Sequence, residues 1–294
     1  MTHPVIAALR QQLKATPVTG IDLEPEVMRE RFNAMTALIP PHPGVSFEQA
    51  ELGGVDGRWI AVEGAEAKRT ILYFHGGAYV IGSAGTHRDL VSRIASAAEA
   101  RVFSANYRLA PEHPYPAALD DALAAFRALV AAGTEPGSIV IAGDSAGGGL
   151  ALCAALALRD AGGPTPGAVA AISPWVDLAS EGESFAKADD PVVIQAELHR
   201  FAKFYVGGGD IRDPLISPIH ASLSGIAPTL VHVGGEEGLR SDCEAFAAAA
   251  KAQGAPIEVE VWDGMIHAWH SYAAILPEGA QAIDKLAAFI AQHT

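Results

Sequence analysis

Cysteine is scarce in this chain, and its scarcity excludes two kinds of scaffold. Only Cys153 and Cys243 occur among the 294 residues, and neither has a second cysteine at metal-ligand spacing. A disulfide framework and a cysteine zinc site are therefore excluded. We expect both thiols to be free and buried, and we expect no metal and no cofactor.

Positive charge is also in short supply. The sequence has 20 Lys and Arg against 34 Asp and Glu, which gives a net charge of −14 with neutral histidines. A surface with this charge repels the phosphates of nucleic acids and of anionic lipids. We therefore expect no nucleic acid as a partner.

Long apolar runs are missing as well. The longest, residues 149–158 (GLALCAALAL), is too short to span a bilayer and predicts a buried helix. The first residues contain no basic stretch ahead of an apolar core, so no export signal is expected. We predict a cytoplasmic protein without stable membrane insertion.

Short β-rich runs alternate with helical stretches between about residues 58 and 262. The runs are IAVEG, TILYFH, RVFSANY, SIVIAG, AVAAIS, TLVHVGG and IEVEVW. The helical stretches, which carry Ala and Leu at helical spacing, are 87–100, 117–132, 146–160, 240–253 and 279–292. This order predicts an α/β fold, with a mostly parallel sheet that is covered by helices on both faces.

Two amphipathic segments, 22–39 and 195–206, fall outside that alternation. Open α/β sheets place their sites at the carboxyl ends of the strands, so we predict that both segments form a cap there. Ordinary core packing is the alternative for each of their apolar residues. The candidates for a substrate pocket are Met28, Phe32, Met35, Phe201 and Tyr205. The corresponding division is 1–44 and 181–218 for the cap, and 45–180 and 219–294 for the core.

The strongest signal is a G-x-S-x-G turn between a β run and a helix, at residues 143–147. This is the context of a nucleophile elbow. A serine on so sharp a turn needs small neighbours, which Gly143 and Gly147 provide. We predict that Ser145 is the nucleophile and that the Ala146 N–H, at the start of the helix, donates to the oxyanion.

A second glycine pair follows the β run at 70–75. Gly76 and Gly77 allow backbone N–H groups to face a substrate, and we predict that both complete the oxyanion hole. A simple loop is the alternative. His75 precedes the nucleophile, whereas the catalytic base should follow it, so we assign His75 to anchoring of the loop.

The predicted base is His267, which lies just past the last β run. His270 is the second choice and fits the surface of a helix. The acid must lie between serine and histidine in the chain. Glu237 falls in the loop after TLVHVGG, while Asp242 falls in the first turn of the next helix, where the helix macrodipole and N-terminal capping already explain an acidic residue. We rank Glu237 first and Asp242 second; Glu236 is expected to point away from Glu237.

Six motifs in order resemble the bacterial hormone-sensitive-lipase-like esterases, the GDXG lipolytic family, in its GDSAG branch. They are HGGAY at 75–79, YRLAPEHPYPAALDD at 107–121, GDSAGG at 143–148, SPWVDL at 173–178, DPLISP at 213–218 and GMIHAW at 264–269. The resemblance implies an eight-stranded α/β-hydrolase fold with a helical cap, a Ser-acid-His triad and activity on short acyl esters. It also makes a homodimer plausible.

Two positions depart from the family pattern. Ala78 stands where the family's oxyanion loop usually has a third glycine, and Glu237 stands where the family typically has an aspartate. The expected function is hydrolysis of small-molecule esters through Ser145, His267 and Glu237. Hydrolysis of a lactone or an amide such as a β-lactam uses the same chemistry and stays open. A ligand-binding receptor on the same scaffold is the alternative from another class.

Overall fold

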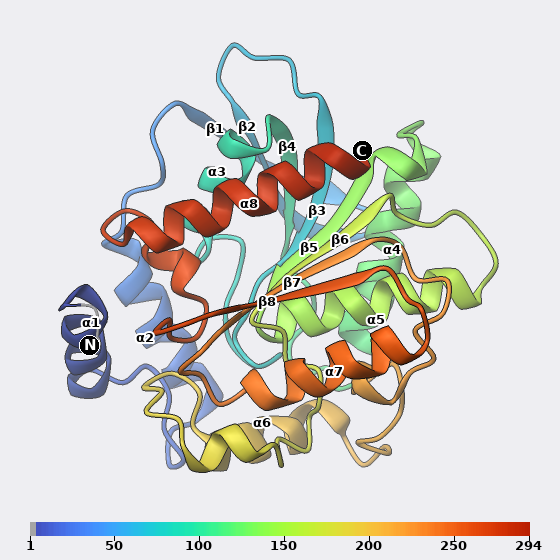
Figure 1. Cartoon of the computed structure of the whole chain (residues 1–294). Helices are drawn as coiled ribbons and strands as arrows, with labels where there is room; N and C mark the ends of the chain where they lie inside the picture. Colours follow the sequence, from blue (N-terminus) through green and yellow to red (C-terminus); the bar gives the residue numbers. More distant parts are fainter. Residues whose placement is uncertain (1–3) are drawn as a thin grey trace.

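The computed structural model describes residues 4–294 as eight strands and eight α-helices with short 3₁₀ turns between them (Figure 1). The sheet order is β1-β2-β4-β3-β5-β6-β7-β8. The pairs β1–β2 and β2–β4 are antiparallel and all the other pairs are parallel. The strands are β1 Val45–Leu52, β2 Val55–Val62, β3 Arg69–Phe74, β4 Ala100–Ala105, β5 Ile139–Asp144, β6 Ala168–Ile172, β7 Thr229–Gly234 and β8 Ile257–Trp262.

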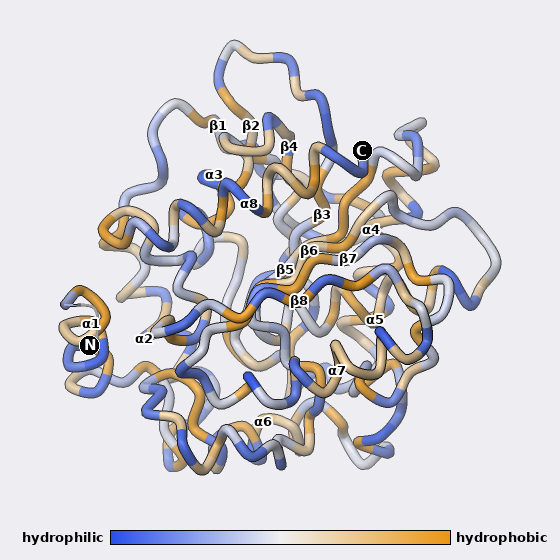
Figure 2. Tube along the Cα trace, viewed as in Figure 1, coloured by the Kyte–Doolittle hydropathy of each residue, from blue (hydrophilic) through white to orange (hydrophobic). Residues whose placement is uncertain are grey.

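Helices cover both faces of this sheet, as the alternating pattern predicts. One face carries α3 (Arg88–Ala97) and α8 (Pro277–His293), and the other carries α4 (Ala117–Ala131), α5 (Ala146–Asp160) and α7 (Arg240–Ala252) (Figure 1). Separate apolar clusters fill the space between the sheet and each helix layer. The strands at the centre of the sheet are the most hydrophobic part of the trace (Figure 2), because helices cover them on both sides.

The α/β-hydrolase fold predicted from the sequence is confirmed, including the eight strands that the resemblance implies. The β1 strand is the one that the pattern analysis missed. Its side chains are mostly exposed or half-buried, so it lacks the apolar run that marks the inner strands. Both cysteines are free and buried, as expected.

The three remaining helices lie beside the carboxyl ends of the strands. They are α1 (Pro4–Ala15), α2 (Pro25–Ala37) and α6 (Gln195–Val206), and Figure 1 places α1 and α2 on the left and α6 at the bottom. All three belong to the segments predicted as a cap, 1–44 and 181–218, of which residues 1–3 lie outside the described part of the chain. The division into cap and core stays a prediction.

Arginine side chains tie these helices to the core through backbone carbonyl groups. Arg29 of α2 donates to the carbonyl oxygens of Val80 and Ala110 at 2.8 and 2.9 Å. Arg88 of α3 donates to the carbonyl oxygen of Ala37 at 2.8 Å. Because these bonds satisfy carbonyl groups at the end of α2 and in two core loops, they fix α2 against the core.

No helix within residues 4–294 combines the length and the apolar character needed to cross a membrane.

A pair of buried histidines joins β7 to the loop after β8. Nδ1 of His232 and Nε2 of His270 lie 3.0 Å apart, and both side chains are fully buried. Burial lowers the pKa of His232 to about 4 and that of His270 well below its usual value. The expectation that His270 lies on a helix surface is wrong, because its ring packs against Trp269 and His232.

We predict that this pair makes the protein sensitive to acid. Both folded-state pKa values lie below the unfolded value of about 6.5, so the fold favours neutral rings. The stability that they contribute is present above pH 6.5 and is lost as the pH falls toward about 4. Urea denaturation at several pH values should show a shallower pH dependence for His270→Gln than for wild type, by up to roughly 1.4 kcal/mol per pH unit.

The matched control is His113→Gln, because His113 is exposed. It should keep the wild-type pH dependence. Equal slopes for His270→Gln and wild type would contradict the assignment.

Candidate active site

Ser145 lies at the junction between β5 and α5 in a strained backbone conformation. Its φ is 54° and its ψ is −122°, a region that a residue with a side chain adopts at a cost. The strain is maintained by hydrogen bonds from the Ser145 N–H to the Ile172 carbonyl oxygen (2.8 Å) and from the Trp175 N–H to the Ser145 carbonyl oxygen (3.0 Å). The serine hydroxyl is therefore presented at the carboxyl end of the sheet.

The two glycines of the motif are required by close packing. A Cβ atom on Gly147 would lie 2.0 Å from the Phe74 carbonyl oxygen, and one on Gly143 would lie 2.4 Å from the Gly147 carbonyl oxygen. These distances are far below van der Waals contact, so a side chain at either position would separate α5 from the sheet. The prediction that Ser145 needs small neighbours is confirmed at Gly143 and Gly147.

The loop after β3 lies next to this turn, but its first glycine is not free. The Gly76 N–H donates to Oδ1 of Asp144 at 3.0 Å, so the prediction of Gly76 as an oxyanion donor is wrong. Within residues 4–294, the N–H groups of Gly77 and Ala78 have no protein acceptor, and both residues border the cavity at Ser145. The loop N–H groups that are free to face the cavity are therefore those of Gly77 and Ala78, a shift of one residue from the sequence prediction.

Asp144 explains this shift. Its carboxylate also accepts a hydrogen bond from the Tyr73 hydroxyl at 2.7 Å and lies 3.3 Å from Nε2 of His87. Burial raises the pKa of Asp144, but His87 and Tyr73 outweigh burial and lower it to about 2. The carboxylate thus stays ionised and joins the elbow to the loop after β3.

His75 packs within the same loop, and its ring does not gain a proton at neutral pH. Its ring stacks on Tyr107 with centroids 4.3 Å apart, and the Tyr107 hydroxyl donates to the His75 carbonyl oxygen at 2.7 Å. Burial, followed by the neighbouring His87, lowers the pKa of His75 to about 3. A ring that stays neutral and packed in this way fits the anchoring role that the sequence suggests.

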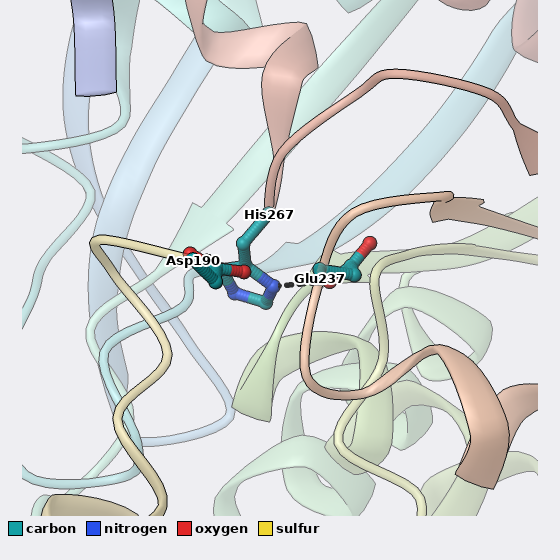
Figure 3. A group of neighbouring side chains, drawn as sticks. All are labelled: Asp190, Glu237 and His267. Atoms are coloured by element: carbon teal, nitrogen blue, oxygen red, sulfur yellow. Dashed lines mark hydrogen bonds and ion pairs between the residues drawn. The ribbon is translucent and has the colours of Figure 1, made fainter. Parts of the chain in front are cut away.

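His267 follows β8 and is bonded to Glu237, which follows β7. Nδ1 of His267 lies 2.6 Å from Oε2 of Glu237, and both side chains are buried (Figure 3). Burial lowers the pKa of His267, but the charge and hydrogen bond of Glu237 outweigh it, so the pKa is raised above its usual value. The carboxylate therefore orients the ring and favours its protonated form.

The second oxygen of Glu237 is held by the core. Oε1 accepts hydrogen bonds from the Ser173 hydroxyl at 2.8 Å and from the Gly234 N–H. Ser173 in turn accepts a hydrogen bond from the Ala268 N–H at 3.1 Å, next to His267. Sequence analysis missed Ser173 as a supporting residue, although it opens the SPWVDL motif.

Asp242 lies in the first turn of α7, as predicted, but makes no side-chain cap. Its carboxylate is buried, and burial, reinforced by Asp177, raises its pKa to about 7. Within residues 4–294, no hydrogen bond joins Asp242 to His267. The capping explanation for this residue is therefore wrong, while its separation from the imidazole agrees with the ranking of Glu237.

A cavity of about 230 Å³ opens at Ser145 and His267, next to α2 and α6. Its wall is mainly apolar and includes Phe32 and Met35 of α2 and Phe201 of α6. Met28 and Tyr205, also predicted as pocket residues, do not line it. Met28 is fully buried against the core, and Tyr205 stacks on Tyr79 with centroids 3.7 Å apart.

The predicted nucleophile and the predicted base face the same cavity but are not bonded to each other. Ser145 and His267 border the same space, yet within the described residues no hydrogen bond joins the Ser145 hydroxyl to the imidazole. Such contacts are often long in ligand-free enzymes and tighten with substrate.

The described residues contain one group of side chains with metal-ligand spacing. Asp190, Glu237 and His267 each place a donor atom within 4.8 Å of the others. Both oxygens of Glu237 already accept hydrogen bonds from protein groups, Oε1 from Ser173 and Oε2 from His267.

Comparison with known proteins agrees with this geometry. The alpha/beta hydrolase fold family matches residues 71–271. An acetyl-hydrolase of Streptomyces hygroscopicus is 48% identical over 77% of this chain and 76% of its own length, and the carboxylesterase NlhH of Mycobacterium tuberculosis is 32% identical over 97% of both chains.

Solved structures agree as well. A crystal structure of an esterase from the bacterial hormone-sensitive lipase family superimposes with a TM-score of 0.95 and 40% identity, and covers 100% of this chain and 99% of that chain. The chain therefore belongs to the α/β-hydrolase fold family, within its bacterial hormone-sensitive-lipase-like branch of esterases.

Proposed function

We propose that this protein is a carboxylesterase that hydrolyses short-chain acyl esters through Ser145, His267 and Glu237. The observation that carries the proposal is the convergence of a strained serine, a buried histidine–carboxylate pair and free N–H groups at one apolar cavity. The family relatives named esterase, carboxylesterase and acetyl-hydrolase support the reaction class.

In the proposed mechanism, the Ser145 oxygen attacks the ester carbonyl while His267 removes its proton. The N–H groups of Gly77, Ala78 and Ala146 hold the tetrahedral oxyanion, and the alcohol leaves with the proton from His267. His267 then activates water, which releases the acid from the acyl-enzyme. Glu237 fixes the tautomer of the ring and stabilises the imidazolium in both steps.

The nucleophile gives the first prediction for this site. We expect Ser145→Ala to abolish cleavage of p-nitrophenyl acetate without lowering thermal stability, because the hydroxyl supplies the covalent step and Ala fits the turn. Wild type should release a burst of nitrophenol equal to the enzyme concentration wherever deacylation is slower than acylation. Activity of the Ala variant within tenfold of wild type would remove Ser145 from this role, and inactivity of wild type toward all esters would favour a receptor.

The identity of the acid gives a second prediction. We expect Glu237→Gln to lower kcat by several orders of magnitude, by analogy with the ~10⁴-fold loss in a triad whose acid is neutralised. Asp242→Asn is the matched control, since it makes the same carboxylate-to-amide change at a neighbouring buried residue. Its kcat should stay within a few-fold of wild type. A large loss in Asp242→Asn with little loss in Glu237→Gln would transfer the role to Asp242.

The cavity gives a third prediction, on chain length. The apolar side chains of α2 and α6 close a small space, so we expect kcat/KM to be highest for short acyl chains, up to about six to eight carbons. Phe32→Ala should shift this optimum toward longer chains because it removes part of the wall. Val27→Ala, on the exposed side of the same helix, should leave it unchanged.

The series of p-nitrophenyl esters should include a lactone, which tests the alternative reaction. A steady rise of kcat/KM into long-chain esters would contradict closure of the pocket by α2 and α6.

A further inference from the structure

A carboxylate that the triad does not use lies against the imidazole of His267. Asp190 belongs to the segment between residues 187 and 194, which precedes α6 and places the Asp190 side chain beside the histidine (Figure 3). Its donor atom lies within 4.8 Å of those of His267 and Glu237. The ring therefore has one carboxylate bonded to Nδ1 and a second one beside it, which comes from the region predicted as cap.

The orientation of Asp190 is fixed by its own loop. Its Oδ1 accepts hydrogen bonds from the N–H groups of Val192 and Val193 at 2.9 and 3.2 Å. Its Oδ2 is buried and has no hydrogen-bond partner within residues 4–294. A buried, unbonded carboxylate oxygen is unfavourable unless a positive charge compensates it, and the group beside it that gains such a charge during the reaction is His267.

The N-terminal helix holds this arrangement together. Arg10 of α1 is 3.5 Å from the carboxylate of Asp189 and 3.2 Å from that of Glu236, the residues that precede Asp190 and Glu237. Lys14 also pairs with Asp189. Ile6 and Leu9 of α1 pack in one cluster with Met265 and Ile266, which lead into His267. The helix α1 therefore joins the loops that carry all three groups.

We propose that Asp190 is a positioning residue, a second carboxylate that the 187–194 segment holds beside His267 to stabilise the imidazolium formed during acyl transfer. The inference rests on the proposed function. When the proton moves from the Ser145 hydroxyl to the ring, the new positive charge faces two carboxylates rather than one. Because this second carboxylate lies beside the ring, its negative charge adds to the basicity of the histidine.

The charged and titratable groups around this pair are few. His267 faces Glu237, Asp190 and, farther away, Asp144. Asp190 faces His267 and Glu237, and its charge also acts on Tyr272. Burial raises the pKa of Asp190 to about 6, which His267 opposes, so the carboxylate is ionised at neutral pH and loses its charge in mild acid.

The direct test is the titration of His267 by NMR, which does not depend on ester turnover. In Asp190→Asn the amide oxygen can still accept both loop hydrogen bonds, so the substitution removes only the charge. We expect the pKa of His267 to fall by about 0.5 to 1 unit. The signal is assigned by its loss in His267→Asn. Asp190→Ser, which keeps a small acceptor, should give the same shift if the Asn variant fails to fold.

The pH dependence of ester hydrolysis by Asp190→Asn should reflect the same fall in the pKa of His267. The acid limb of kcat/KM for p-nitrophenyl acetate should move to lower pH, and kcat at pH 8 should fall roughly 3- to 10-fold, with KM little changed. Glu183→Gln is the matched control, because it removes one charge from an exposed position that precedes the same segment. It should shift neither the His267 titration nor the pH profile.

The outcomes separate this inference from the proposed function. An unchanged His267 pKa in both Asp190 variants overturns the role of Asp190, whether or not esters are hydrolysed. A lowered pKa supports that role. Failure of wild type to hydrolyse any ester overturns the proposed reaction while the titration still decides the position and effect of Asp190.

Discussion

The strained turn at Ser145 is the constraint on which the rest of the site depends. A φ of 54° in a residue with a side chain is costly, and it persists because the backbone hydrogen bonds of Ser145 hold the turn. The turn is possible because Gly143 and Gly147 let β3, β5 and α5 approach so closely that no Cβ would fit at either position. Ser145, which directly precedes α5, borders the cavity. Packing of the central sheet therefore determines both where Ser145 stands and which N–H groups lie near it.

Hydrogen bonds beneath this turn hold the loops in place, whereas the apolar core holds the helices against the sheet. Asp144 connects the elbow to the loop after β3 through the Gly76 N–H, and Ser173 connects Glu237 to the backbone next to His267. Each bond joins loops that are distant in sequence and that leave neighbouring strands. Buried, satisfied bonds of this kind specify one arrangement of the loops, which apolar packing alone would leave adjustable.

Much of this could be predicted from the sequence, because the relevant signals are local. Periodicity marks the inner strands and the helices, and the G-x-S-x-G turn marks Ser145. Chain order, together with the end of β7, favours Glu237, whose bond to His267 is present. The errors arise where a residue's partner lies far away in sequence. Gly76 is bonded to Asp144, and Tyr205 faces Tyr79 rather than the cavity, and no local pattern distinguishes these alternatives.

The loop at Asp190 shows why such partners matter for chemistry. Nothing near Asp190 in the sequence marks it as part of a site, since an aspartate before a proline is typical of an ordinary turn. Its neighbour Asp189 forms an ion pair with Arg10 of α1, as does Glu236, and both residues are separated by more than 170 positions from Arg10. The electrostatic environment of the histidine is thus assembled from three distant segments. A change in α1 would reach Asp190 and Glu237 through these ion pairs, because Asp189 and Glu236 are their immediate neighbours in the chain.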